Sequence, residues 1–183
     1  MRETGMDGEA IALLREMKDR QEIYDCLMRY CRGIDRLDRA LLLSAYHPDG
    51  VDDHGTFVGT VEGFADYAFN LHITHQMRTQ HHITNHRCEI DGDVAHTESY
   101  YIFRSLNRQA PLYTTASGRY LDRLEKRYGK WGIVDRVCLV DIRNEHWAPT
   151  GTEGDANYMP NCRDQNDTSY VRPLRVDCNR FTT

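Results

Sequence analysis

The sequence lacks the features that would place it in a membrane or on a nucleic acid. No stretch approaches the ~20 consecutive apolar residues of a membrane-spanning helix. The net charge is −5 and no block of like charge stands out, whereas a nucleic-acid surface needs a concentrated basic face. The N-terminal residues contain no apolar core before a cleavage site, so we expect no secretory signal. We therefore predict no membrane partner, no nucleic-acid partner and a cytoplasmic location.

The usual metal-binding motifs are also missing. The six cysteines form no CxxC pair, and no HExxH sequence occurs. Histidines are nevertheless numerous, and three of the nine lie together at His81, His82 and His86. On a regular strand His82 and His86 would share one face, as His72 and His75 would on a helix. Because no cysteine or acidic residue accompanies them at ligand spacing, the pattern favours an acid–base site over a metal site.

The expected elements are helices first and strands afterwards. Apolar residues at three- and four-residue spacing, among them Ile23, Leu27 and Tyr30, indicate a long first helix. Turn signals at Asp91-Gly92-Asp93 and Gly129-Lys130 indicate strands joined by hairpins. We expect helices over Glu9–Gly33, Arg39–Tyr46 and Val61–Met77, and strands over Val51–Val58, Arg78–Ile90, Val94–Leu106, Pro111–Tyr128 and Trp131–Arg143. This order predicts an α+β fold, with helices packed on one face of a curved antiparallel sheet.

The character of the sequence changes after Trp147. Residues 1–147 form the expected α+β domain, whereas residues 148–183 are rich in Gly, Pro, Asn, Asp and Thr. Aromatic residues are spaced through this tail, and chains with nothing to bury tend to lack them. We therefore predict an irregular C-terminal extension that docks on the domain or on a neighbouring subunit, the alternative being a disordered tail. A docking tail and covered sheet faces favour a homo-oligomer, either a dimer or a trimer.

One carboxylate, Asp35, is placed to partner a catalytic histidine. Such a histidine needs a carboxylate to hold its tautomer and to stabilise its charged form. Asp35 follows the last apolar residue of the first helix, so its side chain can enter a cavity from the helix end. Tyr30 lies one turn earlier on the same apolar stripe. The residues alone leave plainer roles open, namely helix termination for Asp35 and core packing for Tyr30.

Several short motifs resemble one known family in their order and spacing. They are Tyr30-Cys31-Arg32-Gly33-Ile34-Asp35, His47-Pro48-Asp49-Gly50, Asp52-Asp53-His54-Gly55, Gln80-His81-His82-Ile83-Thr84-Asn85, Asp91-Gly92-Asp93 and Gly129-Lys130-Trp131. Over about residues 9–145 this pattern resembles the SnoaL-like branch of the nuclear transport factor 2-like superfamily. Scytalone dehydratases share the strand Thr79-Gln80-His81, and bile acid 7α-dehydratases share the spacing of Tyr30 and Asp35. Lindane dehydrochlorinases share a strand that here carries His81, Asn85, Arg87 and Glu89.

The resemblance implies a cone-shaped half-barrel with a His81–Asp35 dyad in its pocket, and His82 facing the opposite way. It also implies chemistry without a cofactor. His81 would take a proton, Asp35 would orient and stabilise it, and Tyr30 would donate to or polarise an oxygen. Two departures set the chain apart. The second histidine of scytalone dehydratases has no obvious equivalent, and Tyr30 replaces the lysine of the dehydrochlorinases. We therefore expect the elimination chemistry to carry over, but not the substrate.

Arginine, aromatic and polar residues on the strands and loops are expected to bind the substrate. The expected set is Arg104, Arg143, Tyr101, Phe103, Tyr113, Phe57, His54 and Asn85. The two arginines would stabilise negative charge if they face inward, and would otherwise form surface salt bridges. The four aromatic residues would provide apolar walls, which favour a small, hydrophobic, hydroxylated substrate of the aromatic or alicyclic kind.

Three functions are compatible with these residues. The first is a cofactor-independent lyase that works as a dehydratase, as in the breakdown of aromatic compounds. The second uses the same groups for a retro-aldol cleavage that releases formaldehyde from an aryl diol. The third is a non-catalytic ligand-binding domain of the same fold. Turnover of hydroxylated aromatics by the wild type, and its loss in His81→Ala, would separate the two enzymes from the third function.

Overall fold

The structure is a computed structural model that describes residues 4–110, 113–147 and 161–176. Its elements are α1 (Thr4–Arg36), α2 (Arg39–Leu43), β1 (Tyr46–Asp53), β2 (Val58–Thr60), α3 (Val61–His75), β3 (Gln76–Asp91), β4 (Val94–Asn107), β5 (Tyr113–Arg127), β6 (Lys130–His146) and the short 3-10 helix η1 (Thr168–Tyr170). The expected strand start at Pro111 lies outside the described residues, as do residues 148–160 and 177–183 of the expected extension.

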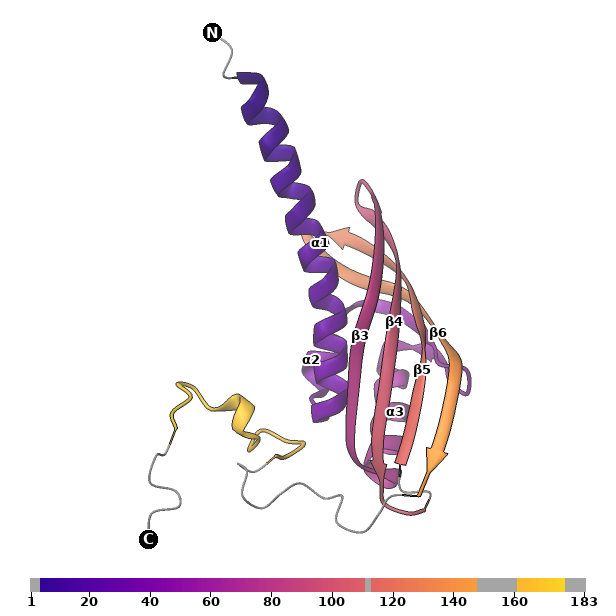
Figure 1. Ribbon diagram of the computed structural model, residues 1–183. Helices are drawn as coiled ribbons and strands as arrows, with labels where there is room; N and C mark the ends of the chain where they lie inside the picture. The colour runs from indigo at the N-terminus through magenta and orange to yellow at the C-terminus, as the bar shows by residue number, and fades with distance from the viewer. Residues whose placement is uncertain (1–3, 111–112, 148–160, 177–183) are drawn as a thin grey trace.

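The strands form one curved six-stranded sheet in the order β2-β1-β6-β5-β4-β3 (Figure 1). Helix α1 packs against β3 and β6, and α3 packs against β1, β2 and β3, so the helices line the sheet. This confirms the predicted α+β fold. The sheet is mixed rather than wholly antiparallel, because β1 pairs parallel with β6. Most of the domain lies between these two strands in sequence, which provides the long crossover that a parallel pair requires.

Helix α1 ends three residues later than predicted. Gly33, which we expected to terminate it, instead allows α2 to approach closely, since a Cβ there would lie 2.5 Å from the backbone nitrogen of Leu42. The turn after α1 is made by Leu37, which adopts a left-handed φ of 55°. Asp35 therefore lies within the last turn of α1. Asp38 then caps α2 by accepting a hydrogen bond from the backbone N–H of Leu41 at 3.0 Å.

The predicted strand over Val51–Val58 is broken by a tight turn. The backbone N–H of His54 donates to the carbonyl of Phe57 at 2.8 Å, and Gly55 adopts a left-handed φ of 74°. Strand β1 accordingly ends at Asp53, and β2 begins at Val58. The turn places His54 directly after the last residue of β1.

A β-bulge divides β3. Ile83 pairs with Tyr101 and His86 with Ser99, so Thr84 and Asn85 together oppose one residue of β4. One extra residue reverses the alternation of faces along a strand. The expectation that His82 and His86 share a face is therefore wrong. His82 is exposed, whereas the His86 ring packs at 5.4 Å from Tyr24 of α1, on the same side as His81.

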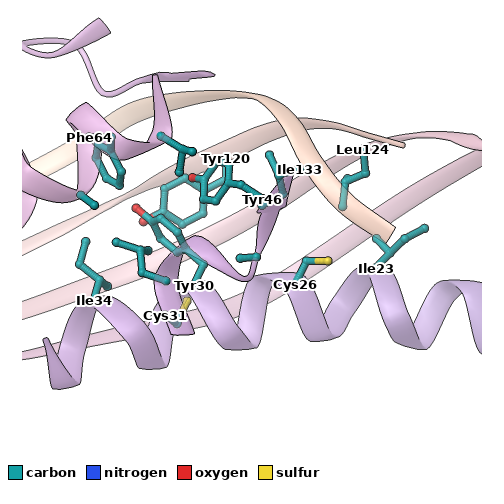
Figure 2. Packing of buried hydrophobic residues seen from close by; sticks show 14 of the residues in the cluster. Ile23, Cys26, Tyr30, Cys31, Ile34, Tyr46, Phe64, Tyr120, Leu124 and Ile133 are labelled. Carbon is teal, nitrogen blue, oxygen red and sulfur yellow. The ribbon is translucent and has the colours of Figure 1, made fainter. Parts of the chain in front are cut away.

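The core lies between α1 and the concave face of the sheet. Figure 2 shows Tyr30 reaching from α1 toward Tyr120 and Tyr46 among the buried side chains. The guanidinium of Arg136 lies 4.1 Å from the centre of the Tyr30 ring and 4.3 Å from that of Tyr120. Nε and Nη2 of Arg136 donate to the carboxylate of Asp122 at 2.7 and 2.8 Å, and this ion pair is fully buried.

Residues 161–176, yellow in Figure 1, lie beside the C-terminal end of α1. The ring of Tyr170 lies 4.8 Å beneath the guanidinium of Arg32, and its hydroxyl donates to Asp38 at 3.1 Å. Arg36 reaches Asp167 at 3.7 Å.

Among the described residues, no helix is both long and apolar enough to cross a membrane.

Candidate active site

His81 and Asp35, 46 positions apart, form a closely bonded pair. His81 lies on the concave side of β3 and Asp35 in the last turn of α1. Nδ1 of His81 lies 2.7 Å from Oδ1 of Asp35, and the backbone N–H of His81 donates to Oδ2 at 2.8 Å. The carboxylate therefore uses both oxygens to hold one residue. This fixes the imidazole plane and leaves Nε2 as the ring nitrogen available to a ligand.

The His81–Asp35 pair is nearly buried. The side chains of His81 and Asp35 are 7% and 12% exposed. Burial raises the pKa of the Asp35 carboxyl, but its electrostatic interaction with His81 and hydrogen bonds from His81 and Thr79 outweigh burial, so the pKa lies below its ordinary value. An ionised carboxylate at Nδ1 stabilises positive charge on the ring. The pair can therefore accept a proton at Nε2 and act as a general base.

His81 opens onto a cavity of about 620 Å³ between the sheet and α3. Its walls include the rings of Tyr101, Phe103 and Tyr120. The Phe103 ring lies 4.8 Å from the His81 ring, and Tyr101 stacks on Tyr120 at 4.5 Å. The volume falls in the usual range for small-molecule sites, and the aromatic walls suit an apolar ligand.

A second histidine–carboxylate pair lines the same cavity. Nδ1 of His54 lies 2.6 Å from Oδ1 of Asp52, and the hydroxyl of Tyr46 donates to Oδ2 of Asp52 at 2.6 Å. Nε2 of His54 lies 3.4 Å from the hydroxyl of Tyr30. The His54 ring also packs at 4.6 Å from the ring of Phe64.

The third histidine of the site, His72 of α3, is held neutral. Burial, together with the neighbouring His81 and Arg163, lowers its pKa to about 3. Its ring stacks at 6.1 Å from that of His81, and its Nδ1 lies 3.2 Å from Nη2 of Arg163. Because arginine only donates, Nδ1 is the acceptor and the proton of His72 resides on Nε2. Arg163 also donates to the backbone oxygens of Asp35, His72 and Gln76 at 3.1, 3.3 and 3.1 Å.

A family model described as the SnoaL-like domain matches residues 15–137, more than half of the chain. The chain belongs to this family. The match confirms the resemblance drawn from the sequence motifs and the cone-shaped nuclear transport factor 2-like fold. No curated protein matched the chain in a sequence comparison.

Solved structures share the fold of this SnoaL-like protein. A type 2 hexachlorocyclohexane dehydrochlorinase (LinA) is 21% identical, with a TM-score of 0.69, over 75% of this chain and 98% of its own. A single-residue variant of Rv3472, a protein of unknown function from Mycobacterium tuberculosis, is 28% identical, with a TM-score of 0.61, over 68% and 77%. A protein of Novosphingobium aromaticivorans, provisionally assigned as a scytalone dehydratase, is 15% identical, with a TM-score of 0.65, over 73% and 91%.

The structure brings together only part of the expected substrate-binding set. Tyr101, Phe103 and His54 line the SnoaL-like cavity, and Arg143 lies at its edge. Arg143 is largely exposed and pairs with Glu145 at 2.7 Å. The remaining members lie elsewhere. Phe57 packs on Tyr67 beside β2, and Tyr113 lies at the start of β5.

Two further members of that set, Arg104 and Asn85, are exposed. Arg104 alternates with the inward Phe103 and Ser105 on β4, so it points to the outer side of the sheet. Asn85 lies at the bulge of β3, which interrupts the regular alternation of side chains between the two faces of the strand. Tyr30, expected near the reacting groups, is fully buried, and its hydroxyl contacts His54.

Sequence reasoning missed three residues around the site, namely Asp52, His72 and Arg163. Asp52 could have been found, because residues two apart on a strand share a face and Asp52 therefore lies beside His54. His72 carried only a helical spacing to His75. Arg163 lies 128 positions from Asp35, in a segment with no periodic pattern, so no sequence signal pointed to it. Among the described residues, no group of three or more His, Cys, Asp or Glu side chains is arranged to hold a metal ion.

Proposed function

We propose that this SnoaL-like protein is a cofactor-independent lyase that removes water from a small hydrophobic hydroxylated substrate, aromatic or alicyclic. The observation that carries the proposal is the His81–Asp35 pair, bonded through both carboxylate oxygens and open to an apolar cavity. Dehydrochlorination in LinA is also an elimination, which supports a reaction of this class.

In the proposed reaction His81 acts as the base. Its Nε2 takes a proton from the carbon beside the one that bears the hydroxyl. Asp35 holds the ring in place and stabilises the imidazolium that forms. The C–H electron pair becomes the new double bond, and the hydroxyl leaves with the C–O pair. A positioned base of this kind contributes ~10²–10⁴ in rate.

The cavity supports the proposed substrate class. Tyr101, Phe103 and Tyr120 provide flat apolar walls, while Gln76 and Asn107 provide polar atoms. A planar ring bearing one or two oxygens matches this mixture of surfaces. Tyr30, which the sequence suggested as a direct donor, is proposed to act through His54, because its hydroxyl is buried against that ring.

The test compares His81→Ala with His82→Ala. His82 is the exposed neighbour on the opposite face of β3, so its substitution controls for changes to the strand. A panel of β-hydroxy aryl ketones and aryl diols is assayed for the conjugated product by ultraviolet absorbance and for formaldehyde. We expect a loss of ~10²–10⁴ in kcat/KM for His81→Ala and a near-wild-type value for His82→Ala.

Two results would replace this proposal. Formaldehyde from an aryl diol, without loss of water, would assign the dyad to a retro-aldol carbon–carbon lyase. Equal turnover by wild type and His81→Ala, or none by either, would leave a ligand-binding protein of the same fold.

A further inference from the structure

The cavity contains two histidine–carboxylate pairs built from different elements. The first joins β3 to α1, and the second joins His54 to Asp52 at the end of β1. Asp52 has a fully buried side chain, whereas that of His54 is 21% exposed. The second pair is therefore anchored at its carboxylate and open to the cavity at its imidazole. Because Nδ1 is taken by Asp52, Nε2 is the ring nitrogen left to serve a bound molecule.

The groups around His54 favour its charged form. The neighbouring carboxylate of Asp52 has its other oxygen occupied by the Tyr46 hydroxyl. Burial lowers the pKa of His54, but hydrogen bonds to Asp52 and Cys138 and the charge of Asp52 raise it to about 9. Tyr30 and Tyr120 face the ring from α1 and β5, and burial raises the pKa of both, so they stay neutral. The buried cation Arg136 is neutralised by Asp122.

We propose that His54 is the general acid of this cavity, and that it selects substrates whose leaving group is an oxygen that must gain a proton. The inference deepens the proposed function and rests on it. Nε2 of His54 makes a long 3.4 Å contact to the Tyr30 hydroxyl, which a substrate oxygen can replace. Tyr30 is then a positioning residue that steadies the ring.

The two histidines together balance the reaction. His81 gains the proton from carbon, and the C–H electron pair forms the carbon–carbon double bond. The C–O bond breaks with its electron pair going to oxygen. The Nε2–H of His54 is transferred to that oxygen, which departs as water. The cycle closes when His81 releases its proton to solvent and His54 takes one up.

An acid in the cavity has a consequence for substrate choice. A hydroxyl is a poor leaving group unless it is protonated, whereas chloride or a carboxylate leaves without a proton. His54 therefore matters for alcohols and little for substrates with a good leaving group. Its presence assigns the site to alcohols rather than to halogenated compounds.

The first test needs no substrate. Nitrogen-15 NMR of labelled histidines, with His54 assigned from the His54→Gln spectrum, reports which ring nitrogens carry protons. We expect both nitrogens of His54 to be protonated at pH 7.5, with a titration midpoint at about 9. Asp52→Asn should lower that midpoint clearly. A His54 ring that is neutral at pH 7.5 would overturn the inference.

The second test varies only the leaving group. 4-Hydroxy-4-phenylbutan-2-one and its 4-acetoxy counterpart lose the same proton and give the same conjugated ketone. We expect His54→Gln to lower kcat/KM for the alcohol ~10²-fold more than for the acetate. Tyr30→Phe should affect the alcohol far less than His54→Gln, and His81→Ala should impair both substrates.

The outcomes separate the two proposals. If His81→Ala is inactive while His54→Gln treats both substrates like the wild type, the inference fails and the lyase stands. An equal loss on alcohol and acetate in His54→Gln would also overturn it, because a purely structural role predicts that result. If the wild type and His81→Ala show the same turnover on every substrate, the proposed function fails and the acid role fails with it.

Discussion

Among the described residues, Arg136 is the largest fully buried side chain, and its charge lies against the ring of Tyr30. Its guanidinium is bonded to Asp122 on one side and covered by the faces of Tyr30 and Tyr120 on the other. Cation–π contacts of this kind strengthen when they are shielded from water. The pair thereby holds the ring of Tyr30, whose hydroxyl in turn contacts His54.

Removing Asp122 should therefore be costly. Asp122→Ala leaves a buried cation without its counter-ion, and breaking such pairs destabilises proteins by about 3–5 kcal/mol. We expect a loss of that size in the free energy of unfolding, measured by urea denaturation. Glu98→Ala, which breaks a partly exposed pair with Arg119, serves as the control and should cost much less, because solvent screens that pair. Equal losses in both variants would contradict the special role of the buried pair.

At the scale of elements, the segment of residues 161–176 is bonded to two helix ends beside the site. Arg163 ties it to the end of α1 and to the end of α3 through the backbone oxygens of Asp35, His72 and Gln76. Its guanidinium also fixes the tautomer of His72, whose ring stacks on His81. The segment is thus linked to both members of the dyad without touching the cavity-facing nitrogen.

Replacing Arg163 should disturb both stability and turnover. Arg163→Met removes a donor from partly buried carbonyl groups such as that of Asp35, and an unsatisfied buried group costs about 1–3 kcal/mol. We expect a lower melting temperature and a kcat reduced by about 10–100-fold with KM little changed, because the dyad shifts rather than the cavity walls. Arg172→Met is the matched control, since Arg172 donates only to backbone oxygens of its own segment in the described structure. If Arg163→Met and Arg172→Met have the same melting temperature and kcat, the contacts of Arg163 do not position the dyad.

At the scale of the whole molecule, the stability should pass through a maximum near pH 6.5. His54 has a folded pKa of about 9, above the unfolded value, so its contribution is complete below about pH 6.5 and is lost as the pH rises through 9. His72 has a folded pKa of about 3, below the unfolded value, so stability is lost as the pH falls from about 6.5 toward 3. The lowered pKa of Asp35 adds to the loss at the acid end.

The two arms of this curve can be assigned by mutation. Chemical denaturation between pH 4 and 9.5 should show an alkaline loss of about 3 kcal/mol in the wild type, from the pKa difference of His54. His54→Gln should flatten the alkaline arm alone, and His72→Gln the acid arm alone. An alkaline arm that survives in His54→Gln would contradict the assignment.

Association of the whole molecule stays a prediction. Tyr100, Leu121 and Val137 are partly exposed on the outer face of the sheet, where they alternate with cavity-facing neighbours. Such a surface is compatible with the expected dimer or trimer.

The sequence by itself determined the local features of this protein. Apolar spacing located α1 and α3, and turn signals located the β3–β4 and β5–β6 hairpins, because these patterns arise between residues close in the chain. The sequence also predicted roles for His81, Asp35, Tyr101 and Phe103, which stay predictions although the first two are bonded and the aromatic pair lines the cavity. Element ends were less certain, since a glycine marks a helix end and a close helix contact equally well, as at Gly33.

Only the tertiary structure decided which of these residues meet and in what state. The bulge in β3 turned Asn85 outward and His86 inward, which no alternation rule predicts without knowledge of the pairing. The approach of Arg163 to Asp35 closes a loop of 128 positions. The opposite pKa shifts of His54 and His72 depend on burial and on neighbours from other elements. Side-chain identity limits the chemistry available, while desolvation and long-range contacts decide which histidine is charged and which is neutral.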